Sequence, residues 1–276
     1  MKAGNTVVLS VDTNIIRNAF GDEKAFEILS ESGFTGVDFS FHERPKGETF
    51  DPFKAKELLD RNGLSCLQTH GPDNFDAKLQ MNESEHTYKE VCDAIGWTHI
   101  LGAKVMALHS LYIPWVSEED EWKMNLSYFK SFEPYLRENN VMIGVENLPL
   151  QVTDTPEDIN RFLSELDSPY YGALLDTGHS RISGIEPQDY IRRLKPGSLI
   201  GIHVQDQHAK MDEHIIPYMG ETDWTAFADA LREAGFQGPM SLEIVRFMEK
   251  VPKELLPAAH KYAASVGEYL IRRVSP

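Results

Sequence analysis

Short apolar runs recur along the chain, and each is followed by a segment whose apolar residues have helical spacing. The runs are rich in Val, Ile and Leu and are apolar on both faces, which is typical of buried parallel strands. They predict strands at residues 7–11, 36–41, 65–70, 104–110, 141–147, 171–179, 199–205 and 240–245. No linker, charge block or short repeat divides the sequence, so we expect a single domain over residues 1–276.

The segments between these runs carry helix start and stop signals. One helix is predicted to begin after Thr155, because Thr155 can cap it, Pro156 suits its first position and Asp158 completes a capping box. Another is predicted between Asp223, a suitable N-cap, and Gly235, a suitable stop. Each apolar run is thus paired with a helix that follows it.

Eight strand-then-helix units that close on themselves predict a TIM-type barrel. The helix before the fifth run is expected to kink or restart near Glu133, since Pro134 cannot continue its hydrogen bonding. A doubly wound open sheet is the alternative, but no Gly-x-Gly-x-x-Gly follows the first run. The pattern therefore favours an α/β fold built as one (β/α)8 barrel.

Composition and charge limit the partners that this barrel can have. Hydrophobic residues make up 41% of the chain, and no apolar run reaches the roughly 18–20 residues of a membrane span. We expect no membrane segment, no secretory signal and, with two cysteines, a reduced cytoplasmic setting. The 27 Lys and Arg against 43 Asp and Glu give a formal charge of −16, which argues against a nucleic-acid partner.

Polar residues stand where the predicted strands end, and the ends of parallel barrel strands face one rim. Burying several carboxylates together is costly unless a cation or protons neutralise them. Carboxylates and imidazoles gathered at one barrel mouth are therefore best explained by a divalent metal. The strand-end residues are His70, His109, Glu146, Asp176, His179, His203 and Glu243.

The segment after the seventh run adds further candidates. Asp212 and His214 are close enough in sequence to offer two metal ligands from one loop. Lys210 is a candidate contact for a substrate hydroxyl or phosphate group. Pro217 and Gly220 indicate a turn that leads into the next helix. A solvated loop with incidental charges would contain the same residue types, so this alternative stays open.

At these residues the sequence resembles the sugar isomerase/epimerase group of TIM barrels, which is related to xylose isomerase and to endonuclease IV. The segments that carry the resemblance are ENLP at Glu146, LLDTGHS around Asp176, HVQD at His203, LEI at Glu243 and the loop from Asp212 to Trp224. In the ketose 3-epimerase branch, the resemblance implies a metal held by Glu146, Asp176, His203 and Glu243. It also implies that the two glutamates are the acid/base pair and that His179 contacts the substrate.

Endonuclease IV has a larger metal cluster, and the resemblance extends to it. The positions that match its additional ligands carry suitable residue types here: His70, His109, His179, Asp212 and His214. The ligand inventory thus permits a multi-zinc site as well as a single ion. The Pro-Gly-x-Gly often seen after the seventh strand of such epimerases is replaced here by residues 217–220, Pro-Tyr-Met-Gly, which leaves the local turn geometry open.

The leading hypothesis is metal-dependent isomerisation or epimerisation of a sugar, a sugar phosphate or another ketose. A hydrogen on carbon next to a carbonyl is a poor acid, and a divalent ion that stabilises the enediolate makes its removal feasible. Glu146 and Glu243 suit the removal and return of that proton, while His70 and His179 are candidate substrate contacts. Oxygen-rich ligation favours Mn or Mg, whereas the extra histidines favour Zn.

Other functions stay open on the sequence alone. A multi-zinc phosphodiesterase acting on abasic DNA would use the same ligands, although no basic stripe supports a DNA partner. A polyol dehydratase would use the same metal and base, and a non-catalytic sugar-binding barrel would hold no metal tightly. A homo-oligomer is also compatible with the sequence, because residues 112–115 (Tyr-Ile-Pro-Trp) are expected to form an exposed apolar loop that could cover a neighbour or act as a lid.

Overall fold

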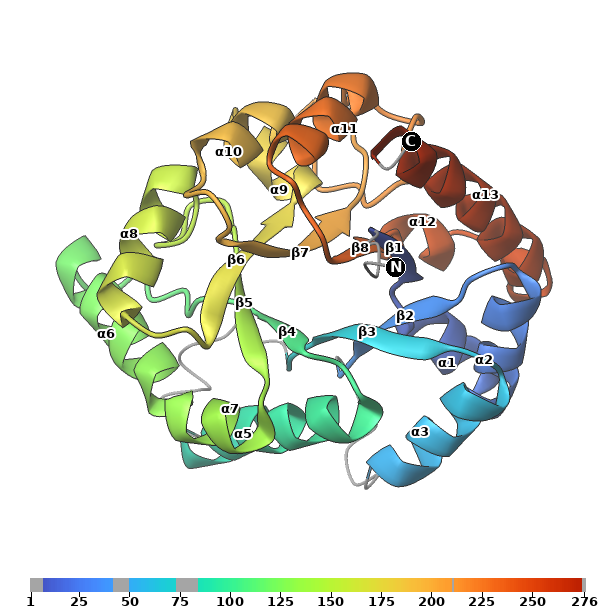
Figure 1. Ribbon diagram of the computed structural model, residues 1–276, viewed down its shortest axis with the longest axis horizontal. Coiled ribbons are helices and arrows are strands. Elements are labelled where there is room, and N and C mark those ends of the chain that lie inside the picture. Colours follow the sequence, from blue (N-terminus) through green and yellow to red (C-terminus); the bar gives the residue numbers. More distant parts are fainter. Residues whose placement is uncertain (1–6, 42–49, 73–83, 210, 275–276) are drawn as a thin grey trace, which may run out of the picture.

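The computed structural model describes residues 7–41, 50–72, 84–209 and 211–274. Its eight parallel strands follow the order β1-β8-β7-β6-β5-β4-β3-β2. Figure 1 shows the strands around a common centre with the helices outside them. A parallel bridge between Asp12 and Asp38 joins the end of β1 to β2 and nearly closes the ring. The predicted (β/α)8 TIM barrel is therefore confirmed, and the open-sheet alternative is wrong.

Each strand overlaps the apolar run that predicted it. The strands are β1 Val8–Val11, β2 Gly36–Ser40, β3 Ser65–His70, β4 Val105–Leu108, β5 Met142–Glu146, β6 Tyr171–Asp176, β7 Leu199–Val204 and β8 Pro239–Leu242. Two runs extend beyond their strands into helices. The Asp176 side chain accepts a hydrogen bond from the His179 backbone N–H at 2.7 Å. This N-cap ends β6 and starts a helix at Thr177.

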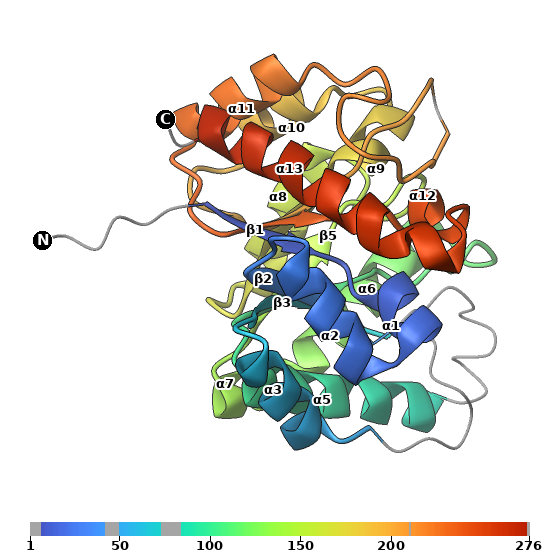
Figure 2. The same cartoon turned by 90° about the vertical axis from the view of Figure 1, so that its right-hand side faces the viewer.

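The helices follow the strands and cover the outside of the barrel (Figures 1 and 2). They are α1 Asn14–Phe20, α2 Asp22–Glu31, α3 Pro52–Arg61, α5 Ser84–Leu101, α6 Glu118–Ser131, α7 Glu133–Asn139, α8 Pro156–Leu166, α9 Thr177–Ile182, α10 Pro187–Arg193, α11 Trp224–Glu233, α12 Val245–Glu249 and α13 Leu256–Val274, with a short 3-10 helix at Lys253–Leu255. The interruption predicted near Glu133 is confirmed, because α6 ends at Ser131 and α7 begins at Glu133.

The sequence signals for helix ends act as predicted. The Thr155 hydroxyl accepts from the Asp158 backbone N–H at 3.2 Å, and the Thr155 backbone N–H donates to the Asp158 carboxylate at 3.1 Å. This reciprocal capping box starts α8 with Pro156 in its first turn. Asp223 caps α11, and Gly235 follows that helix with a φ of 63°.

The apolar core lies between the strands and the helix layer. An aromatic cluster shows how the two layers join. Phe129 of α6 lies with its ring centre 5.2 Å from that of Phe162 of α8 and 6.3 Å from that of Tyr171 of β6. The Tyr171 hydroxyl donates a 2.5 Å hydrogen bond to the Phe129 carbonyl, which satisfies the polar end of a buried ring. The helices are thus held against the strands, and the strand ends are held in place at the rim.

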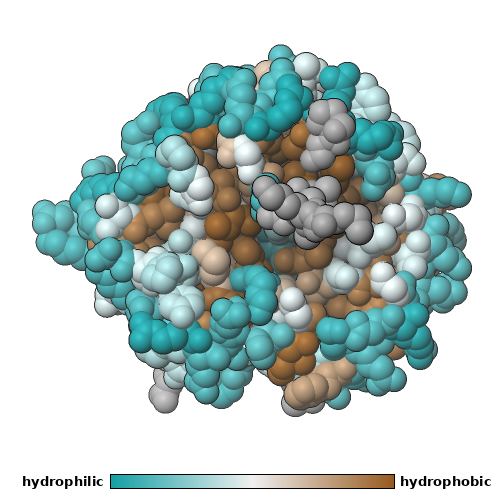
Figure 3. All heavy atoms as spheres, viewed as in Figure 1, coloured by the Kyte–Doolittle hydropathy of each residue, from teal (hydrophilic) through white to brown (hydrophobic). Residues whose placement is uncertain are grey.

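The two ends of the barrel differ in character. In Figure 2, α1, α12 and the loop between β7 and α11 lie at one end, and the start of β1 lies at the other. Figure 3 views the second end, where hydrophilic residues cover the periphery and apolar residues gather toward the middle. Among the described residues, no helix combines the length and apolar character that a membrane span needs.

The apolar loop after β4 is only partly exposed. Tyr112 and Trp115 keep 43% and 44% of their surface accessible, but Ile113 is buried, with 1% accessible. The expectation that Ile113 is an exposed loop residue is therefore wrong. Its backbone N–H donates to the Glu121 carboxylate at 2.7 Å, which ties the loop to α6 and turns the side chain inward.

Removing the cap of α8 tests whether this local signal contributes to stability. Thr155→Ala deletes the hydroxyl that accepts from Asp158, and such caps typically contribute about 1 kcal/mol. We expect the free energy of unfolding, measured in urea, to fall by about that amount. Ser265→Ala, on the exposed face of α13, is the matched control and should change it by less than about 0.5 kcal/mol. Equal effects of the two substitutions would contradict the role given to the cap.

Candidate functional site

A cavity of about 270 Å³ opens at the carboxyl ends of the strands. In a TIM barrel this rim carries the functional residues, because the loops after the strands converge there. Its polar lining residues are Asp12, Asn14, Ser40, His70, His109, Glu146, His179, Asp212, His214, Glu243, Arg246 and Glu249. The structure therefore brings to one cavity the strand-end and loop ligands that the sequence singled out, apart from Asp176 and His203, which lie just beneath it, and Lys210, which lies outside the described residues.

Four of these residues form one compact, buried group. Glu146 ends β5, Asp176 ends β6, His203 lies in β7 and Glu243 follows β8. Their ligand atoms lie within 4.8 Å of one another. Asp176 and His203 are neighbours in the pairing of β6 with β7, so the sheet register itself sets part of this arrangement.

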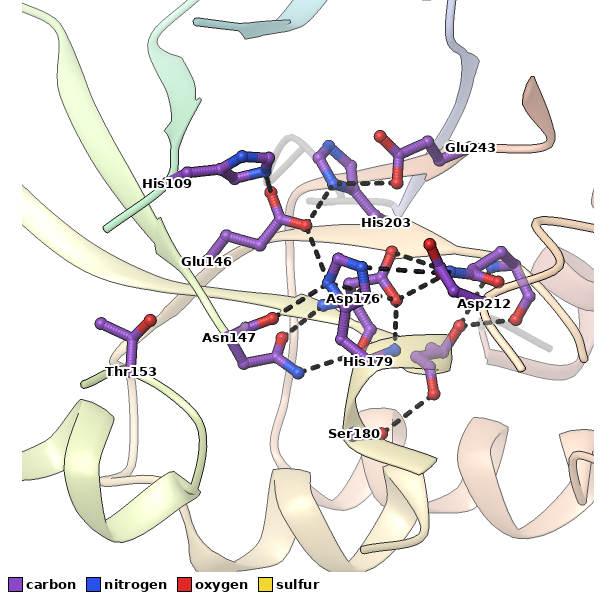
Figure 4. Close-up of polar contacts among 12 residues, drawn as sticks. His109, Glu146, Asn147, Thr153, Asp176, His179, Ser180, His203, Asp212 and Glu243 are labelled. Carbon is purple, nitrogen blue, oxygen red and sulfur yellow. Dashed lines mark hydrogen bonds and ion pairs between the residues drawn. The ribbon is translucent and has the colours of Figure 1, made fainter. Parts of the chain in front are cut away.

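The polar atoms at the centre of this group fit a cation. Glu146 Oε1, His203 Nδ1 and Glu243 Oε2 are buried without a hydrogen-bond partner among the described residues. His203 Nδ1 lies 3.4 Å from the Glu146 atom and 3.5 Å from the Glu243 atom, and Figure 4 shows the three side chains pointing toward one another. Two carboxylates and an imidazole nitrogen in this arrangement are donor atoms that divalent metals accept in proteins.

A second group of possible ligands lies beside the first and comes from α9 and the loop after β7. His214 Nε2 lies 3.0 Å and His179 Nε2 lies 3.7 Å from Asp212 Oδ1. Each ring uses its other nitrogen to donate to a backbone carbonyl, His179 to Asn147 and His214 to Glu243. Both Nε2 atoms therefore face the same carboxylate oxygen, which is the orientation that metal-binding histidines need.

His70 and His109 complete the cavity on the side of β3 and β4. His109 Nε2 donates to Glu146 Oε2 at 3.1 Å, and His70 Nε2 lies 3.5 Å from the same oxygen. The atoms of His70, Glu146 and His203 form a further compact group that could hold an ion. Glu146 thus belongs to the group described first and also contacts the histidines at the ends of β3 and β4.

The two glutamates have opposite electrostatic environments. Burial by itself raises the pKa of Glu146, but the charges of His203 and His109 hold that pKa well below its usual value. Burial raises the pKa of Glu243, and burial together with repulsion from Glu146 and Asp176 outweighs the attraction of His203, so its pKa stands well above the usual value. The metal-free surroundings thus favour the charged form of Glu146 and the neutral form of Glu243.

Two residues that sequence reasoning did not select hold the ligands in place. The Asn147 side chain accepts from the Asp176 N–H at 2.7 Å and donates to the Asp176 carbonyl at 3.2 Å. Gln205 Nε2 donates to Asp176 at 3.2 Å and to Asp212 at 3.1 Å. Both residues stand next to predicted ligands, in the ENLP and HVQD segments, and this adjacency was the only sequence signal for them.

Gly178 is required by this packing. A Cβ atom at Gly178 would lie 2.3–2.5 Å from three atoms of the Gln205 side chain. The Gln205 amide also accepts from the His214 N–H at 3.0 Å, so it links β6, α9 and the loop after β7. Only a residue without a side chain lets Gln205 reach all of these groups.

The loop after β7 is built around buried Asp206. Its carboxylate accepts from the backbone N–H groups of Gly220 and Thr222 and from Trp224 Nε1, at 2.9–3.1 Å. The turn geometry that the sequence left open is now defined, because Tyr218 has a φ of 72°, in the left-handed region. The Tyr218 ring lies 5.7 Å from that of Tyr269 and 6.1 Å from that of Trp224.

Lys210, a predicted substrate contact, lies outside the described residues. Arg246, which the sequence analysis did not select, lines the cavity instead. Its Nη2 lies 2.9 Å from Asp212 Oδ2, so it engages the oxygen that faces away from His179 and His214. A cation three residues after Glu243 was visible in the sequence, but the direction of its side chain was not.

A larger cavity of about 720 Å³ lies at the other end of the barrel. Glycines and apolar residues such as Leu67, Ile200 and Phe236 provide much of its lining. Among its described lining residues there is no histidine, and Glu233 is the only carboxylate. The cavity at the carboxyl ends of the strands therefore carries the chemistry, although it is the smaller one.

Comparison with known families agrees with this geometry. A family model described as "Xylose isomerase-like TIM barrel" matches residues 26–265. The chain belongs to this family. The resemblance inferred from the strand-end segments is thereby confirmed at the level of the family.

Three relatives share 23–29% identity with this chain. An uncharacterized protein of Methanocaldococcus jannaschii, MJ1311, is 27% identical over 211 residues, which cover 72% of this chain and 71% of that protein. The inosose dehydratase of Lacticaseibacillus casei is 23% identical over 90% of this chain and 88% of the dehydratase. The D-psicose 3-epimerase of Enterocloster bolteae is 29% identical over 38% of this chain and 34% of the epimerase.

The fold is also shared with solved structures. A D-tagatose 3-epimerase-like protein superposes with a TM-score of 0.78 at 20% identity, covering 96% of this chain and 98% of the other. At this level of identity the similarity concerns the fold.

The buried histidines make the stability of the metal-free protein depend on pH. Burial lowers the pKa of His179, but Asp176, Glu146 and Asp212 outweigh it and raise that pKa from 6.5 to about 9. Because folding raises the pKa of His179, the protonated ring stabilises the folded protein fully below pH 6.5. This stabilisation is lost as the pH rises to about 9. We expect the free energy of unfolding of chelator-treated protein to fall by up to about 3 kcal/mol over this window, measured in urea.

Two variants test the assignment of this effect. His179→Gln should reduce the pH dependence between pH 6.5 and 9, with the remainder due to His203, whose pKa is also raised. His260→Gln is the control, because burial lowers the pKa of His260 and its titration lies below this window. A full pH-dependent drop in His179→Gln would contradict the assignment.

Proposed function

We propose that this protein is a divalent-metal-dependent enzyme that isomerises or epimerises a sugar, a sugar phosphate or another ketose. The observation that carries the proposal is the buried group of Glu146, Asp176, His203 and Glu243, whose ligand atoms gather within 4.8 Å. Three carboxylates and one imidazole would hold the ion. This donor set suits Zn, Mn or Mg.

The chemistry that the site must support is proton transfer at a carbon next to a carbonyl. A bound divalent ion would supply Lewis acidity, which makes such a hydrogen easier to remove. Glu146, held ionised by His203 and His109, accepts the proton from the substrate carbon. Glu243, whose pKa is raised by burial and by neighbouring acids, returns a proton. Two carboxyl groups whose pKa values are pushed apart divide the roles of base and acid in this way.

The cavity suits a small polar substrate. Its volume of about 270 Å³ lies near the lower end of the roughly 300–1,000 Å³ that small-molecule sites span. His70 and His179 line it and would donate to substrate oxygens, and Lys210 is proposed to contact a hydroxyl or phosphate group. The relatives named inosose dehydratase and D-psicose 3-epimerase support a carbohydrate as the substrate. The formal charge of −16 supports a small molecule over a nucleic acid.

Substitution of either glutamate tests the proton-transfer roles. Glu146→Gln and Glu243→Gln keep the shape of the site but cannot cycle a proton. We expect at least a hundredfold loss in exchange of the substrate α-hydrogen with solvent deuterium, measured by NMR on a panel of ketoses and their phosphates. Glu268→Gln, on the exposed surface of α13, should leave the exchange rate unchanged. Wild-type exchange in both active-site variants would remove the proposed roles.

The same first step serves a dehydratase, and the inosose dehydratase relative covers 90% of this chain. After removal of the α-proton, a dehydratase expels a neighbouring hydroxyl group, whereas an epimerase returns the proton to the carbon. The mass of the product separates these outcomes. We therefore take a product that has lost water as the sign of dehydration and one of unchanged mass as the sign of isomerisation or epimerisation.

One observation favours a second candidate, a multi-zinc phosphodiesterase. Besides the group of four, two further ligand groups lie at the same mouth, one of His70, Glu146 and His203 and one of His179, Asp212 and His214. A cluster of ions held this way could polarise a phosphodiester and activate water. The acidic charge of the chain argues against a DNA substrate for such a site.

Metal stoichiometry distinguishes the two candidates. We expect one tightly held ion per chain in protein purified without added metal, measured by elemental analysis, and no cleavage of an abasic duplex. His214→Asn should leave that stoichiometry unchanged if a single ion occupies the group of four. Three ions per chain together with cleavage of the duplex would favour the phosphodiesterase.

A further inference from the structure

We propose that Asp38 is the positioning residue for His203, holding its ring so that Nδ1 faces the metal-binding group, and that Gln68 holds Asp38 in turn. This inference rests on the proposed metal centre. It concerns residues of β2 and β3, which form the side of the barrel opposite β7. Neither Asp38 nor Gln68 belongs to the ligand groups described above.

The contact between Asp38 and His203 crosses the interior of the barrel. Asp38 Oδ2 lies 3.1 Å from His203 Nε2, and both residues are buried, with 1% or less of their surface accessible. An ionised carboxylate can only accept hydrogen bonds, so the imidazole Nε2 must carry the proton. In the neutral ring, Nδ1 then has a free lone pair, and it is this atom that lies 3.4–3.5 Å from Glu146 and Glu243.

His203 differs in this respect from three of the other candidate ligand histidines. His70, His179 and His214 each use Nδ1 to donate to a backbone carbonyl, which leaves Nε2 toward the cavity. His203 is oriented the other way round, with Nδ1 toward the site and Nε2 toward a side-chain carboxylate. A carboxylate partner makes an imidazole a stronger electron donor than a carbonyl partner does. Asp38 therefore sets both the tautomer of His203 and its strength as a ligand.

Gln68 fixes the carboxylate that does this. Asp38 and Gln68 are register partners of β2 and β3, and Gln68 Nε2 donates to Asp38 Oδ2 at 2.6 Å. Gly201 of β7 leaves the space for Gln68, since a Cβ there would lie 2.4 Å from Gln68 Oε1. Two donors thus meet on one oxygen of Asp38 and hold it in a single orientation.

The charge of Asp38 argues against a purely structural role. Its other oxygen, Oδ1, is buried without a hydrogen-bond partner among the described residues. A buried carboxylate with hydrogen bonds to only one of its oxygens carries a large desolvation cost. A neutral amide could accept from Gln68 and His203 at a lower desolvation cost. Positive charge on the far side of the His203 ring, supplied by a bound cation, would offset that cost.

The tautomer of His203 gives a direct test in the wild-type protein. Long-range ¹H–¹⁵N NMR correlations of histidine-labelled, metal-free protein, recorded at a pH high enough for the ring to be neutral, distinguish the two neutral tautomers, and the His203→Gln variant assigns the signal. We expect the proton on Nε2. A proton on Nδ1 would overturn the proposal, whatever the variants show.

Substitution of Asp38 tests its effect on metal binding. Asp38→Asn keeps the size of the side chain but removes the charge and allows an N–H group to face His203. We expect divalent-metal affinity, measured by competition with a chromogenic chelator, to fall by about 10- to 100-fold. Ser241→Ala is the matched control, because Ser241 is equally buried in the barrel interior and is the register partner of His203 in β8. Its metal affinity should equal that of the wild type.

The outcomes separate this inference from the proposed function. Wild-type protein that binds no divalent ion would refute the proposed metal centre and this inference with it. Wild-type binding together with equal affinity in Asp38→Asn would refute only the role of Asp38. An equal loss of affinity in Asp38→Asn and Ser241→Ala would show a general disturbance of the barrel interior and would also refute it. If Asp38→Asn does not fold, the tautomer of the wild-type protein decides.

Discussion

The structure depends on the burial of several carboxylates at one end of the barrel. Glu146 and Asp176 are fully buried and Glu243 nearly so, which is unfavourable without positive charge nearby. Histidine rings surround them, and the atoms of Glu146, His203 and Glu243 that lack hydrogen bonds face one another. The rim therefore offers a group of donor atoms that could hold a cation. Among the described residues, the opposite ends of the strands carry no comparable constraint and are lined largely by apolar residues and glycines.

The residues around the ligands explain how this arrangement is held. Asn147 and Gln205 form hydrogen bonds with Asp176, and Asp206 organises the loop that follows β7. Asp38 approaches His203 from the opposite side of the barrel. These supporting groups come from different strands and loops, so the site depends on closure of the barrel. Such support keeps ligands oriented before an ion or a substrate binds.

The parts of the fold that depend on local interactions were predictable. The capping box of α8 involves residues three positions apart, and the break before α7 follows from one proline. Predictions failed where a side-chain contact redirected the backbone. Residues 177–179 continue an apolar run, yet they form a helix because Asp176 caps it. Ile113 lies in an apolar loop but is buried, because Glu121 holds its backbone against α6.

The sequence by itself determined the order of strands and helices, and it placed carboxylates and histidines at the strand ends. Both follow from hydrophobic periodicity and from the cost of polar groups in buried strands. Only the tertiary structure decided which nitrogen of each imidazole faces the cavity and in which direction the pKa of each glutamate moves. It also showed that Asp38, at sequence distance 165 from His203, lies against its ring. The orientation of a ring and the pKa of a carboxyl group depend on which groups the closed barrel brings together. The linear sequence does not show which groups these are.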